Sequence, residues 1–349
     1  MTLAARLVSS IRQVRTYALV AVGILLLAVP YLVTDIMKTL TGNQYPFVAV
    51  VIAYGFIFGI YGLAFNLLLG YSGVVSFGHA GIFALGAYVQ AIMIRHLPVQ
   101  YTLEVYLILA TATCAAVCAA YGLLLARRVS IFFGILTLAL GMVLYSLFLK
   151  LWFITGGTDG LRLPTPALLG ITFAVTKEVW LTKIYYYYLL AALVLCTIVI
   201  WVIVNSPFGK TLQAIRDNEI RANFIGVRVY RYRWLAFILS GAFTGLAGCL
   251  WGPLNGHVTP EIAYWTFSGE IVFLTVLGGF AYFSGPIIGG MIFTIIKTYA
   301  IGLTVYWSFV LGVTLIFLLF VMPRGLVGGG MTVYGKIARR SHSRKSETE

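Results

Sequence analysis

The chain has 349 residues, of which 61% are hydrophobic and only 10% are charged, and this composition excludes an ordinary soluble globular domain. Its formal net charge is +14, but the Lys and Arg residues stand at the ends of apolar runs and not in a patch with interleaved aromatic residues. The charge therefore indicates membrane topology, and we expect no nucleic-acid partner.

A membrane-spanning helix needs about 20 mostly apolar residues. On that rule the sequence predicts an all-α, polytopic helical bundle of about ten spans over residues 17–322, embedded in a lipid bilayer. In chain order the predicted spans are Tyr17–Val33, Phe47–Leu69, Gly78–Ile94, Val105–Ala126, Ile131–Ile154, Tyr185–Val204, Trp234–Leu254, Phe267–Tyr282, Pro286–Ile301 and Tyr306–Met322.

The distribution of basic residues predicts the orientation of these spans. Three arginines precede the first apolar run and no small-residue cleavage site follows it, so we expect a retained first span after a cytoplasmic segment, residues 1–16. If the chain starts in the cytoplasm and crosses the membrane ten times, 17 of the 24 Lys and Arg residues lie on the cytoplasmic side. Since cytoplasmic loops carry the excess of basic residues, both termini are expected there, including a basic tail, residues 323–349.

Small residues recur at a spacing of four in several spans, which places them on one face of a helix. One row is Ser72, Ser76, Ala80 and Ala84, another is Ser240, Thr244, Gly248 and Gly252, and two GxxxG pairs are Gly241 with Gly245 and Gly285 with Gly289. In lipid, close packing of helices depends on such residues. These rows predict helix contacts, and the alternative is that they line a path.

Polar groups inside the apolar runs are few, and a charge at the bilayer centre costs at least about 2.5–3.5 kcal/mol. Those that stand out are Asn66, His79, Glu270 and Lys297. His79 is typical of a packing histidine with satisfied hydrogen bonds, while Glu270 and Lys297 lie near enough to span ends to reach toward the interface. The alternative is a translocation path or substrate site, for which the candidates are Ser72, Ser76, His79 and Glu270.

Two glycine-rich breaks interrupt the pattern of spans. Gly278 and Gly279 lie near the end of the eighth span, and a second break ends the fifth span near its outer face. Irregular backbone at that depth is tolerated only inside protein or beside water. The residues of the fifth-span break are therefore further candidates for the path or substrate: Thr155, Gly156, Gly157, Thr158 and Asp159.

Asn205–Arg233, called here the basic segment, is the one long polar interruption and joins two spans. It has six Lys and Arg residues against Asp217 and Glu219, which predicts a cytoplasmic location. Ser206 and Pro207 predict the start of a helix and Gly226 its end. Its apolar face is expected to contain Phe208, Leu212, Ile215 and Ala222, with Glu219 among them. Two interpretations remain open: a solvated interfacial helix, or a docking helix for a cytoplasmic partner.

The sequence carries no evident chemistry of its own. Part of a phosphate-binding loop motif is present at Gly209, Lys210 and Thr211. The full motif requires glycine where Val204 stands, and it follows a strand, whereas these residues follow a predicted span. Neither a catalytic triad nor a cluster of metal ligands is visible, so we expect no catalytic residue, metal or cofactor in this chain. The four cysteines lie in apolar runs and are expected to be small buried hydrophobes.

The motifs together resemble the permeases of branched-chain amino acid ABC transporters, over most of residues 60–328. The run Gly70–Gly73, then Ser76–Ala80 and Gly86–Tyr88, is similar to the family signature, and Thr155–Leu161 is similar to the TGG(S/T)DGL run of the M-type subunit. The basic segment, Gly278–Gly279, Gly285–Gly289 and Pro323–Leu326 continue the resemblance. Phe280–Tyr282 depart from it, because the family places a glycine and a small polar residue there.

The resemblance implies a type II-like importer in the bacterial inner membrane, in which this chain is not an enzyme. Its implied partners are a second, H-type permease subunit in a heterodimer, two cytoplasmic ATPases that hold ATP and Mg, and a periplasmic substrate-binding protein. The implied substrates are leucine, isoleucine and valine. It also implies ATPase coupling through Gly209, Leu212, Ala214, Ile215, Arg216, Glu219, Ala222 and Gly226. Independently of the resemblance, the small-residue pattern predicts helix packing at Gly241, Gly245, Gly248, Gly278, Gly279, Gly285 and Gly289.

Two other functions stay open at this point. The same architecture imports urea or short-chain amides, because specificity rests largely with the binding protein. An ion-coupled secondary transporter is the more distant alternative, since such proteins usually need acidic groups deep in the membrane, and Glu270 is the one acidic residue so placed.

Overall fold

The computed structural model describes residues 27, 28, 30, 46–97, 100–126, 130–173, 175–323 and 325–330, and the statements below concern these residues. The segment 1–16, nearly all of the first predicted span and residues 331–349 of the tail lie outside the described residues.

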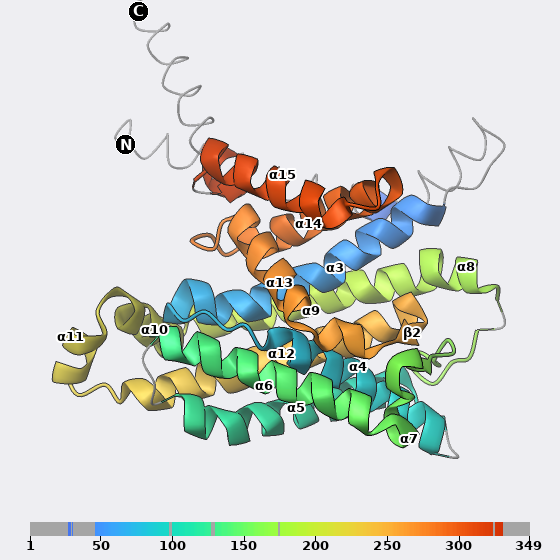
Figure 1. The fold of residues 1–349 in the computed structure, drawn as a ribbon, viewed down its shortest axis with the longest axis horizontal. Helices are drawn as coiled ribbons and strands as arrows, with labels where there is room; N and C mark the ends of the chain where they lie inside the picture. Colours follow the sequence, from blue (N-terminus) through green and yellow to red (C-terminus); the bar gives the residue numbers. More distant parts are fainter. Residues whose placement is uncertain are drawn as a thin grey trace, which may run out of the picture.

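The described chain is a bundle of helices, most of which run along the long axis of the molecule (Figure 1). The longer elements are α3 Pro46–Asn66, η2 Leu67–Ser72, α4 His79–His96, α5 Leu103–Leu125, α6 Ser130–Lys150, η4 Trp180–Tyr185, α9 Tyr186–Asn205, α10 Pro207–Asp217, α11 Glu219–Phe224, α12 Val229–Asn255, α13 Trp265–Gly278, α14 Gly285–Leu303 and α15 Trp307–Val321. The short ones are α7 Trp152–Thr155, η3 Gly157–Asp159, α8 Lys177–Val179, η5 Pro260–Ala263 and an antiparallel pair of strands, β1 Leu161–Arg162 and β2 His257–Val258.

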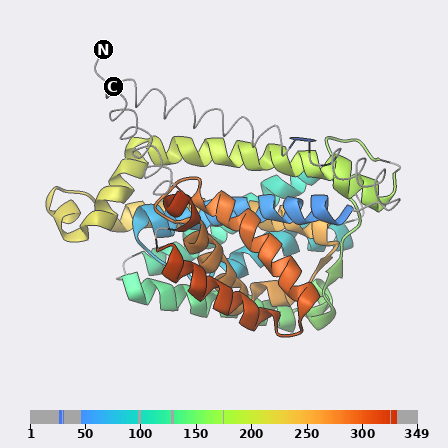
Figure 2. The ribbon, with the colours of Figure 1, turned by 90° about the horizontal axis from the view of Figure 1, so that it is seen from above.

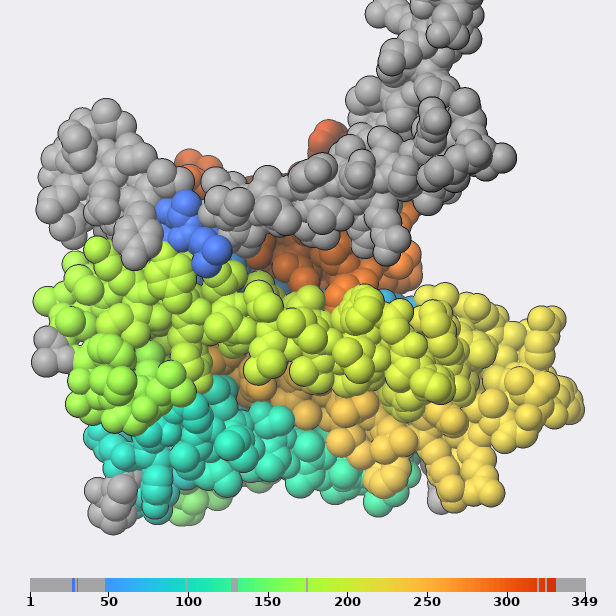
Figure 3. Space-filling view, turned by 180° about the vertical axis from the view of Figure 1, so that it is seen from behind, coloured from blue at the N-terminus to red at the C-terminus, as the bar shows by residue number. Residues whose placement is uncertain are grey.

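The prediction of a polytopic all-α bundle is confirmed. Each of the nine predicted spans that fall among the described residues coincides with a helix. Six helices are long and apolar enough to cross a membrane, and α13 and Trp307–Leu318 are shorter apolar helices. Exposed apolar side chains cover the outside of the bundle, as on α9, which runs across the middle of the face seen in Figure 3. Such a surface suits lipid as its solvent.

Small residues let α12 lie in the middle of the bundle, packed against α3, α4 and α5. A Cβ added at Gly248 would collide with the backbone carbonyl oxygen of Phe83 in α4. Gly241 and Gly245 lie in the same way against the Sγ atoms of Cys118 and Cys114 in α5. Close backbone approach is therefore the geometry that these positions require.

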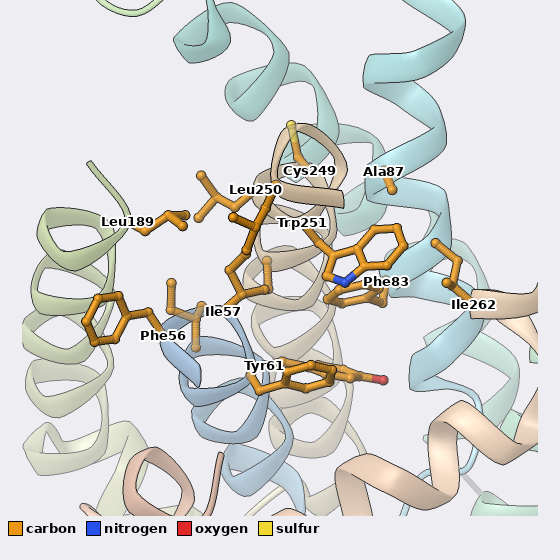
Figure 4. Close-up of a cluster of buried hydrophobic side chains, with 14 of the residues drawn as sticks. Phe56, Ile57, Tyr61, Phe83, Ala87, Leu189, Cys249, Leu250, Trp251 and Ile262 are labelled. Atoms are coloured by element: carbon orange, nitrogen blue, oxygen red, sulfur yellow. The ribbon is translucent and has the colours of Figure 1, made fainter. Parts of the chain in front are cut away.

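The four cysteines are free and buried, as the sequence predicts. Beside α12, the apolar core joins α3, α4 and α9, where Phe56 and Tyr61 of α3 lie near Phe83 of α4 and Leu189 of α9 (Figure 4).

The two ends of the bundle differ. At one end α10 and α11 project beyond the other helices (Figures 1 and 2), and this is called the basic end because it carries the basic segment. At the opposite end lie α7, α8 and β2. The two sets of candidate residues, in the basic segment and in the fifth-span break, are thus a bundle length apart.

Candidate functional site

The basic segment folds as two helices. The predicted start is confirmed, since the Ser206 hydroxyl accepts a hydrogen bond from the Gly209 amide at 3.5 Å and Pro207 follows it. The prediction of one helix as far as Gly226 is wrong. Asn218 has extended backbone, and its side chain caps α11 by accepting from the Arg221 amide at 2.9 Å. A cap inside the segment lets the chain turn between α10 and α11.

The apolar face of the basic segment packs on this chain's own helices. Leu212, Ile215 and Ala222 are 0%, 1% and 2% exposed, and Gly209 is buried as well. Leu212 packs in a cluster with residues of η2 and α9, and the Phe208 ring stacks on that of Tyr232 in α12. Four of the eight candidate coupling residues therefore position the helices and do not face outward.

The outward surface of the basic segment contains other residues. Of the candidate coupling residues, Ala214, Arg216 and Gly226 are exposed. This surface also contains three large apolar side chains that were not predicted as coupling residues, Ile220, Phe224 and Ile225, which are 69%, 86% and 73% exposed. Their signal was available, because large apolar side chains grouped in a basic, polar segment are typical of an interaction site.

An ion pair braces α11 against α12. The Arg233 guanidinium donates two hydrogen bonds to the Glu219 carboxylate, at 2.9 and 2.6 Å. The Arg233 side chain is only 7% exposed, whereas that of Glu219 is 38% exposed. Glu219 thus forms its ion pair within its own chain, and its carboxylate neutralises the charge of a buried guanidinium.

Replacement of Glu219 by Gln is expected to destabilise the chain by about 1.5–3 kcal/mol, the range for hydrogen bonds to charged groups. Arg233 would keep its charge and lose its partner, so Glu219→Gln combined with Arg233→Met should cost less than the sum of the single changes. Thermal unfolding of the three purified variants measures this coupling. Strictly additive effects would contradict an energetic role for the pair.

Arg216 fastens α10 to the irregular end of α3. Its Nη1 donates to the Gly70 carbonyl oxygen at 2.5 Å, and its Nη2 lies 3.0 Å from Asp217 Oδ1. Gly70 belongs to the π-helical turn η2, and Gly73, with φ of +73°, leaves the space in which the Arg216 side chain lies. Such π-helical turns occur frequently at functional sites. A displacement of α10 would therefore pull directly on the break between α3 and α4.

Beyond that break, a buried chain of hydrogen bonds joins three helices. His79 Nδ1 lies 2.8 Å from Ser76 Oγ, and His79 Nε2 lies 2.8 Å from Ser240 Oγ in α12. Ser240 in turn donates to the Ala64 carbonyl oxygen of α3 at 2.6 Å. Ser76, His79 and Ser240 are fully buried, so both ring nitrogens have partners inside the protein and neither faces open space.

Two buried polar side chains near this chain of bonds lack partners among the described residues. They are Asn66, through both amide atoms, and Ser72, through its hydroxyl. Ser72 is the last residue of η2, and a Cβ at Gly70 would collide with Asn66 Oδ1. The candidate path residues Ser72, Ser76 and His79 thus follow one another along the irregular connection from α3 to α4.

The fifth-span break lies at the opposite end of the bundle. Thr155 is buried, with its hydroxyl donating to the Phe148 carbonyl oxygen at 2.5 Å. Gly156 and Gly157 have positive φ values of +78° and +61°, which turn the chain into η3. Thr158 and Asp159 are exposed at this turn. Of the five candidates, Thr158 and Asp159 therefore face outward, whereas Thr155, Gly156 and Gly157 shape the turn.

Glu270 and Lys297, the two charged residues expected near span ends, pair with each other. Lys297 Nζ lies 2.7 Å from Glu270 Oε1 and 2.6 Å from Glu270 Oε2. The Lys297 side chain is 21% exposed and that of Glu270 is 15% exposed. The ammonium also lies 5.4 Å from the Trp307 ring centroid and 5.8 Å from that of Phe267. This pair neutralises both charges between α13 and α14, which lowers the cost of burying them.

Comparison with known proteins places this chain in a family. A family model described as "Branched-chain amino acid transport system / permease component" matches residues 47–319. The chain is 28% identical to the permease LivM of Escherichia coli (strain K12) and 30% identical to LivM of Salmonella typhimurium (strain LT2), each match covering 78% of this chain and 68% of the relative. It is 26% identical to LivH of Salmonella typhimurium, over 78% of this chain and 92% of the relative. No solved structure matches the chain.

The fold and the matched residues define an integral membrane protein of the transport class. The chain belongs to the family of permease components of branched-chain amino acid transport systems. Identity is higher to the LivM relatives than to LivH, in agreement with the resemblance to the M-type subunit.

Proposed function

We propose that this chain is the M-type permease subunit of an ATP-binding cassette importer that carries leucine, isoleucine and valine into the cytoplasm. The observation that carries this proposal is the family match over residues 47–319, which includes the whole basic segment. The relatives LivM and LivH are each named as permeases of high-affinity branched-chain amino acid transport. Substrate arrives from a periplasmic binding protein in this proposal, and the membrane is the bacterial inner membrane.

The basic end faces the cytoplasm in this proposal and meets two ATPase subunits, which hold ATP and Mg. Support comes from the basic charge of this end and from the exposed tip of α11, where Ile220 and Phe224 lie outside the bundle. Ile220, Phe224 and Ile225 contact the ATPase. The buried residues Leu212 and Ile215 hold the tip in place.

Movement of the ATPase pair is converted to a change of access through three connected parts. The ATPase displaces α10 and α11 as one unit, because Ile215 of α10 and Ala222 of α11 pack in one buried cluster. The Glu219–Arg233 pair links this unit to the start of α12. Arg216 transfers the displacement to the Gly70 carbonyl and so to η2. The connection from Ser72 to His79 then shifts against α12, and the path changes from outward to inward access.

The second permease subunit is an H-type paralogue, so that the two form a heterodimer. Similarity to both LivM and LivH supports this pairing of related chains. The binding protein docks at the end of the bundle opposite the ATPases, where Thr158 and Asp159 are exposed. Both termini, in segments 1–16 and 323–349, lie in the cytoplasm, as their basic residues favour.

Two alternatives make different predictions about substrate and energy source. Import of urea or short-chain amides uses the same architecture with another binding protein. The ion-coupled secondary transporter is disfavoured, because Lys297 already neutralises Glu270, the acidic residue that such a mechanism would use.

The proposal is tested by uptake into proteoliposomes that contain the chain with its co-purified partners. Expected is ATP-dependent accumulation of labelled leucine that requires the binding protein and that unlabelled isoleucine and valine suppress. A matched preparation with a hydrolysis-deficient ATPase provides the control. Accumulation of urea in place of leucine, or uptake that an ion gradient drives without ATP, would overturn the assignment.

A further inference from the structure

Two cavities meet at the basic end, where α5 ends and α12 begins. The larger has a volume of about 690 Å³ and is lined by Gly122, Leu123, Leu124, Arg231 and Trp234, among others. The smaller, of about 510 Å³, is lined by residues that include Arg228, Arg233 and Glu219. Ala126 and Tyr230 line both cavities, so the two adjoin each other, and together they are called the cleft.

The smaller cavity is cationic and contains an unused donor. Arg228 and Arg233 line it against a single carboxylate, that of Glu219. Glu219 occupies the two Nη groups of Arg233, but Arg233 Nε is buried and has no acceptor among the described residues. A buried N–H of a guanidinium without an acceptor is costly, so this cavity favours an anion with hydrogen-bond acceptors.

The larger cavity is apolar and opens outward. Leu123, Leu124 and Leu235 on its walls are 60%, 72% and 44% exposed. Its back wall is fixed, because the Trp234 indole donates to the Ala119 carbonyl oxygen at 2.8 Å and the ring fills the space that Gly122 leaves open. Arg231, which is exposed, stands on the rim. Apolar walls beside a cationic pocket fit a molecule with acyl chains and an acidic head.

We propose that this cleft binds an anionic phospholipid. The phosphate lies among Arg228, Arg231 and the Nε of Arg233, and the acyl chains lie along Leu123, Leu124 and Leu235. Basic pockets between membrane helices select acidic head groups in this way. The lipid also wedges between α5 and the Glu219–Arg233 pair, and so it stiffens the support of α11. The site does not depend on which solute the protein transports.

The test uses the full-length chain, purified in mild detergent with its partner subunits and titrated with phosphatidylglycerol, with bound lipid counted by native mass spectrometry. Arg228→Gln combined with Arg231→Gln is expected to weaken retention on the order of 30-fold, from the attraction of two cations to an acidic lipid. Arg221→Gln provides the matched control, since Arg221 is an exposed cation of the same segment that lines neither cavity.

Two further ligands identify which part of the lipid is recognised. Phosphatidylcholine is expected to be retained on the order of 30-fold less well than phosphatidylglycerol, because it has no net negative charge for the two cations to attract. Soluble glycerol phosphate is expected not to compete. Equal retention of the two lipids would overturn the proposal, as would equal loss in the Arg221→Gln control or full competition by glycerol phosphate. Unchanged melting temperatures show that the variants are folded, and no arm depends on transport, so failure of the lipid site is distinguishable from failure of the proposed function.

Discussion

Replacement of Gly248 by valine is expected to reduce the yield of folded protein severely and to lower the melting temperature of what remains. The new Cβ would meet the carbonyl oxygen of Phe83, which is backbone and has no rotamer to change. Helix α12 would have to separate from α4, although it also packs on α3 and α5. Overpacking in a close-packed interior typically costs about 1–3 kcal/mol, and contact with backbone places this site at or above the upper end.

The control for this variant is Gly312→Val. Gly312 also lies in an apolar helix, α15, but a Cβ added there has nothing within 4 Å. Both variants gain the same side chain in a helix, so the difference between their melting temperatures in detergent isolates the contact with α4. Equal melting temperatures would show that the small face of α12 is not needed for close approach.

Replacement of Ile220 and Phe224 together by aspartate is expected to abolish substrate-stimulated ATP hydrolysis while the chain stays folded. Both side chains lie outside the bundle, at 69% and 86% exposure, so their loss removes little packing within the chain. If they anchor the ATPase, two charges in the contact should weaken association by roughly 30-fold or more, as for interface hot spots. Co-purification of the ATPase with this chain measures the association directly.

Two comparisons separate docking from folding in this experiment. Phe224→Leu keeps an apolar side chain and should retain most of the association. Leu212→Asp alters a fully buried residue of the same segment and should reduce the amount of folded protein in the membrane. Normal coupling in the Ile220→Asp/Phe224→Asp variant would eliminate the α11 tip as the ATPase contact.

The parts of the fold that could be predicted are those that lipid or local backbone imposes. A membrane-spanning helix such as α12 must be long and apolar, because the bilayer offers its backbone no hydrogen bonds. The length and apolar character of such a helix can be read directly from the local sequence. The helix start at Ser206 and Pro207 is equally local. The break at Asn218 was missed, although asparagine is a favoured cap, because the apolar residues on either side continue one helical period across it.

Contacts between distant residues could not be predicted from local patterns. Arg216 reaches the Gly70 carbonyl across 146 positions of sequence, and Lys297 meets Glu270 across 27. Nothing in the periodicity around Glu219 indicates that its partner is Arg233. An amphipathic pattern shows that a face is buried, but it does not say by what. The pattern therefore left open whether the face with Leu212 and Ile215 meets the interface or a partner, and the structure shows that this chain covers it itself.

The thiols of Cys114 and Cys118 lie under glycines of α12, and this arrangement makes them natural reporters of helix separation. A maleimide reagent can reach either sulfur only while α5 and α12 stand apart, since in the packed state Gly245 and Gly241 cover them. The rate of alkylation, compared with and without ATP, would therefore report how often α5 and α12 separate. The native sequence thus already carries the label that such an experiment usually has to introduce.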